Sequence, residues 1–169
     1  MKDAIIYDID NTLIDSRRRY FTSLLEAANG RRVQSIRDLT GEERNKFWDI
    51  FLSSKYLHLD TPITETIEEV NSKYNTGLYI ILLTGRPEYM YEDTVKQLKM
   101  FGVKYHRIYM RPLYDKNPDY IYKPAQIRRI MAEGFNILEY HDDSVSALER
   151  VRQLYPKILV CRHGFGEMF

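Results

Sequence analysis

Hydrophobic residues along the chain gather in two kinds of pattern, which alternate from end to end. Short apolar runs, typical of strands buried on both faces of a sheet, predict strands over residues 3–8, 78–83, 106–110, 136–140 and 157–161. Apolar residues at helical spacing predict helices over residues 17–29, 41–54, 62–74, 88–101, 124–132 and 144–154. Residues 111–122, with two prolines and two aspartates, predict a loop. Strands that alternate with helices indicate an α/β domain with a mainly parallel, covered sheet.

One segment interrupts this alternation. Two helices are predicted between the first strand and Pro62, where a simple strand-helix-strand unit needs one. The chain is therefore expected to consist of a core, residues 1–15 and 61–169, and a small helical insertion, residues 16–60.

Composition narrows the class of partner. The 169 residues are 44% hydrophobic and 29% charged, as in globular proteins that bury a proper core, and the formal net charge is +1. That charge gives no bulk electrostatic attraction to nucleic acid or to a membrane. Cys161 is the only cysteine, so no intrachain disulfide can form. No signal peptide and no apolar run long enough to span a bilayer are visible, so a cytoplasmic protein with no membrane partner is expected.

Polar side chains follow four of the predicted strands. They are Asp8, Asp10, Asn11 and Thr12 after the first strand, Thr84, Gly85 and Arg86 after the second, Arg111 after the third, and His141, Asp142, Asp143 and Ser144 after the fourth. Ligands of open parallel sheets bind outside the carboxyl ends of the strands, so these residues are expected to meet at one edge. The acids would repel one another there unless a hard divalent cation lay among them, and Mg²⁺ with substrate phosphate oxygens fits such a cluster.

Four motifs at these positions, in this order, resemble the haloacid dehalogenase (HAD) superfamily of phosphatases. They are DIDNT (8–12), LLTGR (82–86), a lysine that opens a helix (Lys123) and HDDS (141–144). The resemblance implies a Rossmann-like three-layer α/β sandwich, a magnesium-dependent phosphomonoester hydrolase, and a cap formed by residues 16–60. It implies that Asp8 is the nucleophile, that Asp10 is the acid/base, and that Mg²⁺ is held by Asp8, Asp10, Asp142 and Asp143.

The chemistry of these residues agrees with those roles. A carboxylate at Asp8, fixed by the end of its strand, can attack phosphorus and form an aspartyl-phosphate, which divides one hydrolysis into two steps. Asp10 is close enough to protonate the leaving oxygen and then to take a proton from the attacking water. Lys123 is preferred as the catalytic lysine because Pro124 behind it suits the first helical position, which would place the ammonium near nucleophile and phosphate.

Six residues are predicted to bind the substrate phosphate: Asn11, Thr12, Thr84, Gly85, Arg86 and Arg111. A hydroxyl and free backbone N–H groups at a strand-to-helix turn suit an anion, although a Thr-Gly pair can also simply make a turn. Arg86 could reach phosphate or pair with a surface acid, and Thr12 could orient Asp10 or cap the next turn.

The fourth motif has two compatible uses. Asp142 is expected to ligate the metal directly, while Asp143 or Ser144 caps the helix that follows. His141 is expected to pack at the strand end rather than to bind this metal, because the cluster consists of hard oxygens.

Within that superfamily, the last two-thirds of the chain resembles the phosphatase domain of phage-type polynucleotide kinase-phosphatases. The shared features are TGRPE (84–88), Arg111 after the third strand, the paired aspartates after the fourth, and the closing HGFGEMF (163–169). That resemblance implies a phosphorylated substrate that can be the 3′ end of a nucleic acid. The chain departs from that group in having no P-loop kinase motif and in placing Asn11 where the group usually has Gly.

A cluster of arginines flanks the insertion: Arg17, Arg18, Arg19, Arg31 and Arg32. It could contact a phosphate backbone, or form a solvated helix face balanced by glutamates. The open interpretations are a polynucleotide 3′-phosphatase, a small-molecule or nucleotide phosphatase, a phosphotransferase or mutase that uses the same intermediate, and a non-catalytic phosphate-binding module. A phosphatase leads because all four motifs are complete.

Overall fold

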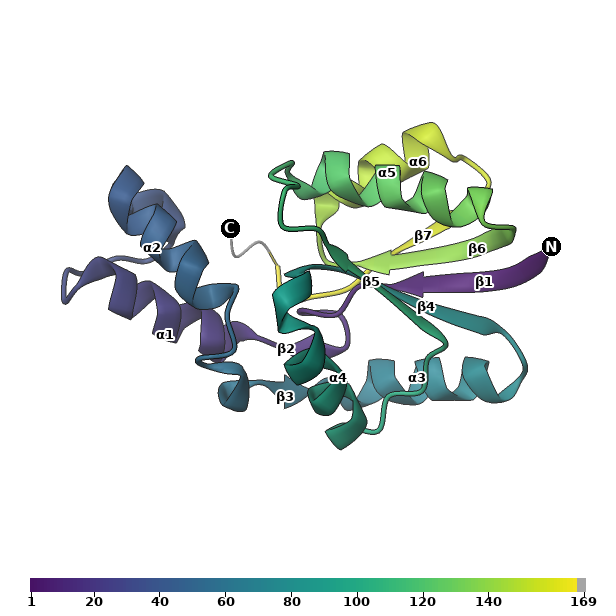
Figure 1. Ribbon diagram of the computed structural model, residues 1–169, viewed down its shortest axis with the longest axis horizontal. Coiled ribbons are helices and arrows are strands. Elements are labelled where there is room, and N and C mark those ends of the chain that lie inside the picture. The colour runs from purple at the N-terminus through teal and green to yellow at the C-terminus, as the bar shows by residue number, and fades with distance from the viewer. Residues whose placement is uncertain (167–169) are drawn as a thin grey trace.

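A parallel β-sheet forms the centre of the computed structural model, which describes residues 1–166 (Figure 1). Within those residues the sheet has five strands in the order β5-β4-β1-β6-β7, and each neighbouring pair is parallel. The strands are β1 (Lys2–Tyr7), β4 (Tyr79–Pro87), β5 (Arg107–Arg111), β6 (Phe135–Asp142) and β7 (Leu159–Arg162). The predicted α/β, Rossmann-like sheet is confirmed.

Helices cover both faces of this sheet, which makes three layers. Figure 1 shows α5 (Asp119–Ala132) and α6 (Val145–Leu154) on one face, and α3 (Thr64–Asn75) and α4 (Tyr91–Met100) on the other. Successive residues of a strand point to opposite faces, so Ile6 packs with the α5 side and Tyr7 with the α3 side. Burial on both faces explains why the strands are continuous apolar runs rather than alternating ones.

The segment between β1 and α3 forms a helical unit beside the sheet (Figure 1). It contains α1 (Arg17–Ala28), η1 (Ile36–Asp38), α2 (Gly41–Phe51) and η2 (Leu57–Leu59). These elements bury their own hydrophobic cluster, in which the rings of Tyr20, Phe47 and Phe51 pack together. The unit therefore has a small core separate from those beside the sheet.

A two-stranded antiparallel ladder joins this helical unit to the core. Residues of β2 (Ile14–Asp15) pair with residues of β3 (Thr61–Pro62). The expectation that Pro62 opens a helix is wrong, because Pro62 lies in β3 and α3 begins at Thr64. Strands of two residues leave no hydrophobic periodicity, so the sequence pattern does not reveal them.

The start of α5 differs from the prediction. The helix begins at Asp119, where the carbonyl of Pro118 accepts bonds from the Ile121 and Tyr122 amides at 3.0 and 2.9 Å. The loop predicted over 111–122 therefore ends four residues earlier. Lys123 does not open the helix, and Pro124 lies inside it rather than at its first position. The missing N–H of Pro124 costs one helical hydrogen bond, which the packing of the neighbouring buried residues must offset.

The remaining boundaries agree with the predictions to within a few residues. The largest difference is at β4, which continues past Leu83 to Pro87 with an irregular register against β5, and is followed by η3 (Glu88–Met90). The predicted strand-to-helix turn at Thr84 is therefore a bulged end of the strand. The last three residues of the closing HGFGEMF segment lie outside the described residues.

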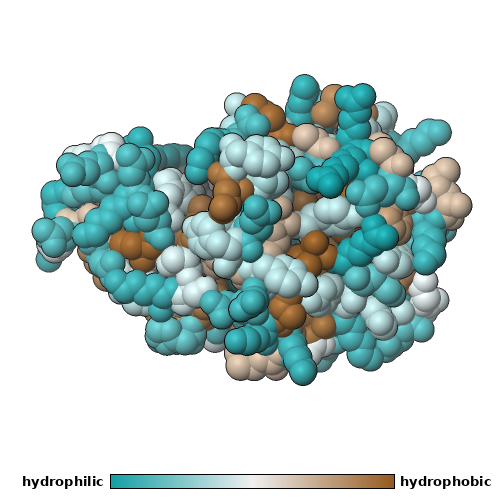
Figure 2. Space-filling model, viewed as in Figure 1, coloured by the Kyte–Doolittle hydropathy of each residue, from teal (hydrophilic) through white to brown (hydrophobic). Residues whose placement is uncertain are grey.

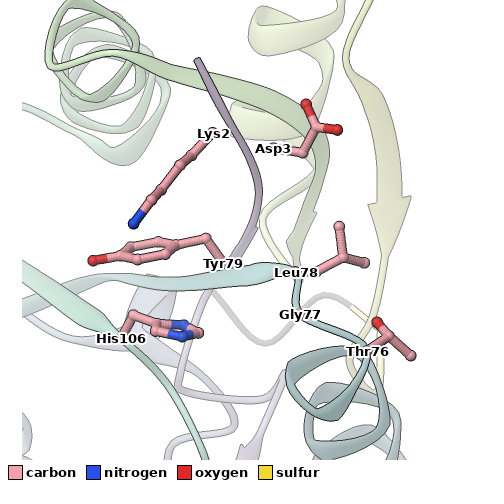
Figure 3. Close-up of a pocket in the computed structure, with 7 residues that line it drawn as sticks. All are labelled: Lys2, Asp3, Thr76, Gly77, Leu78, Tyr79 and His106. Carbon is pink, nitrogen blue, oxygen red and sulfur yellow. The ribbon is translucent and has the colours of Figure 1, made fainter.

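Hydrophilic residues dominate the face shown in Figure 2, where hydrophobic residues form small separate groups. Within residues 1–166, no helix combines the length and the apolar character needed to cross a bilayer. A shallow pocket lies at the amino ends of β1 and β4, where Lys2 reaches over the Tyr79 ring beside His106 (Figure 3). It is at the opposite edge of the sheet from the clustered acids.

Candidate active site

The turn after β1 fixes the first carboxylate. The amide of Asp8 donates to the carbonyl of His141 at 2.8 Å, which extends the strand ladder by one residue. The amides of Thr12, Leu13 and Ile14 then bond back to the carbonyl of Ile9. This tight turn keeps the side chain of Asp8 almost fully buried at the carboxyl edge of the sheet. The hydroxyl of Thr12 donates to Asp8 Oδ2 at 3.2 Å, and so it holds Asp8 rather than Asp10.

Asn11 makes the turn possible by adopting a left-handed backbone, with φ of 62°, which asparagine tolerates better than most residues. Its side-chain oxygen accepts from both the amide and the hydroxyl of Ser16, at 3.1 and 3.2 Å. These contacts give Asn11 a local structural use beside its predicted phosphate-binding role.

The ammonium of Lys123 lies between two acids. Its Nζ donates to Asp8 Oδ1 at 2.9 Å, to Asp142 Oδ2 at 3.0 Å and to the carbonyl of Leu83 at 3.0 Å. Lys123 is 1% exposed, so it is not a solvated loop lysine. Burial alone would lower its pKa, but Asp142 and Asp8 raise the pKa of Lys123 well above its usual value. The lysine therefore stays charged and neutralises part of the acid cluster.

Three carboxylates gather around this lysine. Ligand atoms of Asp8, Asp142 and Asp143 lie within 4.8 Å of one another. Burial and the Asp142 carboxylate raise the pKa of Asp8 to about 7, although Lys123 opposes that rise. Burial, Asp8 and Asp142 together raise the pKa of Asp143 to about 11. Burial alone would raise the pKa of Asp142, yet Lys123 keeps it below its usual value.

These pKa directions show that one ammonium cannot stabilise three ionised acids. A further cation would remove the conflict, and a set of carboxylate oxygens is the donor set that Mg²⁺ prefers. The residues present therefore fit a magnesium ion. Asp10, the fourth predicted ligand, is not part of this group of side chains.

The Asp10 carboxylate instead binds two guanidinium groups. Arg86 contacts it through two nitrogens, with Nε to Oδ2 at 3.0 Å and Nη2 to Oδ1 at 2.8 Å. Arg19 donates to Oδ1 through Nη2. Burial alone would raise the pKa of Asp10, but Arg19 and Arg86 hold it well below its usual range.

A second buried acid, Asp60, completes this network. Arg19 Nε lies 3.0 Å from Asp60 Oδ1, and Arg86 Nη2 lies 3.5 Å from Asp60 Oδ2. The side chains of Arg19, Arg86 and Asp60 have no exposed surface. Two positive and two negative groups are thus paired beneath the site, and they connect the helical unit to the core.

This network decides two questions left open by the sequence. Arg86 pairs with acids of the protein, which are buried rather than on the surface. Arg19 does not belong to a solvated arginine face, because it is buried with the Asp10 and Asp60 carboxylates and the Phe51 carbonyl as partners. Arg19 and Asp60 were both missed as site residues, and their only sequence signal is a charged residue at a helical position that the apolar pattern predicts to be buried.

The comparison with protein families places this geometry. The family model described as HAD superfamily, subfamily IIIB (acid phosphatase) matches residues 1–157. The chain belongs to the HAD superfamily. It is a phosphatase of the class that hydrolyses phosphomonoesters, as the HAD resemblance of its four motifs predicts. No curated protein matches the sequence.

Solved structures of HAD phosphatases share the fold. A haloacid dehalogenase-like hydrolase from Streptococcus pneumoniae is 16% identical with a TM-score of 0.69, and the match covers 98% of this chain and 87% of that one. Mycobacterium tuberculosis protein tyrosine kinase A is 16% identical with a TM-score of 0.74, again covering 98% and 87%. A chain of the Pnkp1/Rnl/Hen1 complex is 18% identical with a TM-score of 0.68, covering 99% of this chain but 47% of that one. This chain therefore spans about half of that relative.

Within the HAD site, Thr84 and Gly85 lie on the bulged end of β4. The carbonyl of Thr84 accepts from the Tyr122 hydroxyl at 3.0 Å, and its own hydroxyl accepts from the Arg86 amide. A Cβ added at Gly85 would come within 3.3 Å of Asp119 Oδ1 and 3.5 Å of Arg111 Nη2. Glycine thus leaves room for the pair that Arg111 forms with Asp119 at 2.7 Å.

Arg111 braces the loop beside the HAD site. Besides Asp119, it donates to the carbonyls of Gly85 and Asn117. At 15% exposure its side chain is largely covered, so phosphate binding by Arg111 stays a prediction.

The fourth motif behaves as expected at the helix. The hydroxyl of Ser144 accepts from the Ala147 amide and caps α6, and the Ser144 amide donates to Asp142 Oδ1 at 3.0 Å. His141 packs against the Tyr7 ring with centroids 4.1 Å apart. The Asp142 side chain is therefore held from both sides, by Lys123 and by the start of α6.

The described part of the tail closes one side of the HAD site. A Cβ at Gly164 would lie 2.9 Å from Asp143 Cβ and 3.6 Å from the carbonyl of Asn11, and its φ of 100° also favours glycine. The next residue, Phe165, packs its ring 3.6 Å from the guanidinium of Arg17. The tail therefore links the acid cluster to the first residue of α1.

Proposed function

We propose that the protein is a magnesium-dependent phosphomonoester hydrolase that works through an aspartyl-phosphate on Asp8. The observation that supports this most directly is the gathering of Asp8, Asp142 and Asp143 around the buried ammonium of Lys123. Mg²⁺ held by these acids would neutralise charge on the nucleophile and on the substrate phosphate.

In the first step of this proposal, a carboxylate oxygen of Asp8 attacks phosphorus. The new O–P bond forms as the ester P–O bond breaks, and the leaving oxygen takes up a proton. In the second step water attacks the phosphorus of the aspartyl-phosphate, the acyl-phosphate O–P bond breaks, and Asp8 and inorganic phosphate are released. Lys123, beside Asp8, stabilises the negative charge that develops in both steps.

Asp10 is proposed to move the protons. Its pKa is held low by Arg19 and Arg86, so the ionised form that accepts a proton from water is favoured. Donation to the leaving oxygen in the first step needs the protonated form, which is disfavoured while both arginines are in contact. The proposal therefore assigns the acid role to a state in which one of these contacts has opened.

We propose that residues 16–60 act as a cap over the carboxyl edge of the sheet. The Arg19 contacts to Asp10 and Asp60 couple the first cap helix to the acid/base residue. A movement of α1 would therefore change the partners of Asp10, which connects the position of the cap to proton transfer.

Metal removal tests this function directly. Hydrolysis of an aryl phosphate should fall to background in excess chelator and return when Mg²⁺ is restored, because the three acids need a cation that Lys123 alone does not supply. Ca²⁺, which takes more ligands at longer distances, serves as the control and should not restore the rate. Full activity in chelator would contradict the metal role.

A nucleic acid 3′ end is the second candidate for the substrate. One relative in the fold belongs to the Pnkp1/Rnl/Hen1 complex, which a second structure of that complex describes as an RNA repair complex. In this chain, Arg17 and Arg18 are exposed at the start of α1, and Arg17 is connected to the acid cluster through Phe165 and Gly164. Arginines in this place could bind the phosphates that neighbour the scissile one.

Salt dependence distinguishes this candidate from a small-molecule phosphatase. A 3′-phosphorylated oligonucleotide should be hydrolysed with a higher kcat/KM than a nucleoside 3′-monophosphate, and the advantage should shrink with salt. Replacing Arg17 and Arg18 by Ala should lower the slope of log kcat/KM against log salt by about one per contact, and should leave aryl phosphate hydrolysis unchanged. The exposed Arg128 of α5, changed to Ala, is the matched control. Equal responses of both substrates would favour the small-molecule interpretation.

A further inference from the structure

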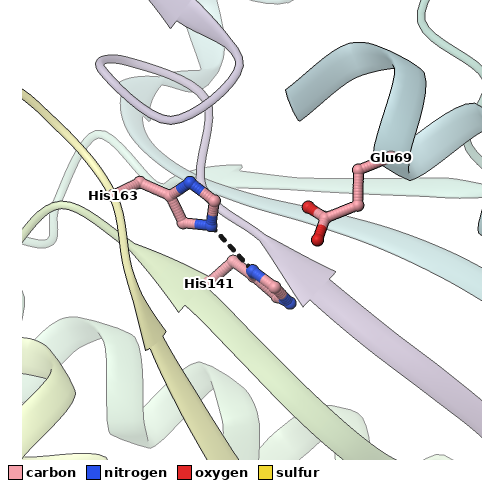
Figure 4. Close-up of side chains that lie close together, drawn as sticks. All are labelled: Glu69, His141 and His163. Carbon is pink, nitrogen blue, oxygen red and sulfur yellow. Dashed lines mark hydrogen bonds between the residues drawn. The ribbon is translucent and has the colours of Figure 1, made fainter. Parts of the chain in front are cut away.

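A second group of metal-ligating side chains lies on the other face of the sheet from the acid cluster. His141 at the end of β6, His163 just after β7 and Glu69 on α3 converge on one point (Figure 4). One ligand atom from each lies within 4.8 Å of the other two. Tyr7, which donates to Glu69 Oε2 at 3.0 Å and stacks on His141, marks this as the α3 side of the sheet.

The two imidazoles are oriented for ligation. His141 Nε2 lies 2.7 Å from Glu139 Oε1, which places the proton on that nitrogen and leaves the Nδ1 lone pair free. His141 Nδ1 faces His163 Nε2 at 2.8 Å, so two ring nitrogens point at each other across the space of one proton. A carboxylate that fixes the tautomer of a ligating histidine is the usual outer partner of zinc sites, and Glu139 has that position.

We propose that His141, His163 and Glu69 form a binding site for Zn²⁺ that is distinct from the magnesium cluster. Two imidazoles and one carboxylate are a common set of three protein ligands for this ion, with water in the fourth position. Tetrahedral ligands at ordinary zinc distances are about 3.3 Å apart, so the two nitrogens need to separate by about half an ångström. His163 can move, since it is only partly buried and follows the last strand.

The charges around the site leave room for a cation. Lys73 Nζ contacts Glu139 Oε1 at 2.9 Å and Glu69 Oε1 at 3.5 Å, so one ammonium faces two carboxylates. Burial lowers the pKa of both His141 and His163, which keeps them neutral and able to ligate. Lys73 is the competitor of the metal, and its partly exposed side chain can turn toward solvent when Zn²⁺ binds.

Donor chemistry separates the two sites. The cluster around Lys123 offers only carboxylate oxygens, which suit Mg²⁺, whereas imidazole nitrogens suit Zn²⁺. The sites are nevertheless adjacent along the chain, because His141 precedes Asp142 and the His163 amide donates to the Asp142 carbonyl at 2.9 Å. Zinc would therefore fasten the ends of β6 and β7 beside the acid cluster. This inference does not depend on the proposed function.

Titration of the metal-free protein with Co²⁺, a spectroscopic substitute for Zn²⁺, tests the site. In excess Mg²⁺, which occupies the oxygen cluster, one Co²⁺ per chain should give the intense visible bands of a nitrogen-containing site of low coordination number, and one equivalent of Zn²⁺ should abolish them. His163→Gln and Glu69→Gln should each weaken Co²⁺ binding at least about tenfold, and Glu139→Gln about 10- to 100-fold through the lost outer partner. The controls are His58→Gln, at an exposed cap histidine, and Asp143→Asn in the oxygen cluster; both should bind as the wild type does.

Two results would overturn the site. One is a wild-type spectrum that shows no such bands. The other is a set of bands that survives in His163→Gln and Glu69→Gln or disappears in Asp143→Asn. Unfolding midpoints measured in chelator show whether each variant is folded. Glu69 is 39% exposed, so its variant keeps the test valid if His163→Gln does not fold.

Discussion

Changing Asp8 to Asn is expected to lower the rate of phosphomonoester hydrolysis by more than about a hundredfold, because the neutral amide cannot attack phosphorus. The variant should remain folded. Burial raises the pKa of Asp8 to about 7, which means that the ionised carboxylate is disfavoured in the fold and that its loss removes a destabilising charge. Steady-state kinetics with an aryl phosphate in saturating Mg²⁺ would measure the effect.

Asp15→Asn is the matched control for this change. Asp15 is a nearby acid on β2 whose partner is Arg17 on the surface, so its rate should stay within a few-fold of wild type. An Asp8→Asn enzyme that retains wild-type turnover would mean that another group attacks phosphorus.

Replacing Lys123 by Met is expected to destabilise the protein by about 3–5 kcal/mol, because it leaves two buried carboxylates without their partner. Lys123 is 1% exposed, and water cannot take over its bonds to Asp8 and Asp142 without entering the site. Hydrolysis should also fall sharply. Urea unfolding of both proteins in chelator would measure the difference, with Lys116→Met on the exposed loop as a control of equal chemistry.

The effect of Lys123 on stability should depend on pH. Lys123 keeps the pKa of Asp142 below its usual value, so this carboxylate contributes stability above its unfolded pKa and loses the contribution as the pH falls. The gap between wild type and Lys123→Met should therefore be largest near neutral pH and narrow below about pH 4. A gap that is constant from pH 7 to pH 3 would show that Lys123 acts through packing alone.

The carboxyl ends of the strands could be predicted from the sequence because each buried strand is a continuous apolar run that ends abruptly in polar residues. That pattern was enough to bring Asp8, Thr84 and Asp142 to one edge of a parallel sheet. It could not show how the side chains pair, since pairing depends on rotamers and on contacts between distant segments. Thr12, for example, bonds Asp8 rather than Asp10.

The buried ion network shows the same limit at longer range. Arg19 and Asp60 are 41 residues apart and meet only because the two ends of the insertion come together at β2 and β3. In the sequence Arg19 stands among consecutive arginines and is indistinguishable from its exposed neighbours. Helical spacing places it on the same face as Tyr20 and Ser23, and burial of that face is a property of the folded cap.

The start of α5 illustrates a conflict between local signals. Proline after Lys123 favoured a helix that begins there, yet Pro118 and Asp119 are also residues that start helices, and the earlier start was not distinguishable by propensity alone. The earlier start puts Lys123 in the second turn, where its chain reaches inward toward Asp8. The position of the lysine was thus inferred correctly from a helix boundary that was wrong.

Trapping the covalent intermediate tests the central claim most directly. The enzyme would be mixed with a phosphorylated substrate and Mg²⁺, quenched in acid, reduced with borohydride and mapped by peptide mass spectrometry. Reduction of an aspartyl-phosphate converts that aspartate to homoserine, and we expect this change at Asp8, in wild type but not in Asp8→Asn. Homoserine at Asp10, Asp142 or Asp143 instead, or a phosphoryl group mapped to a different side chain, would contradict the account.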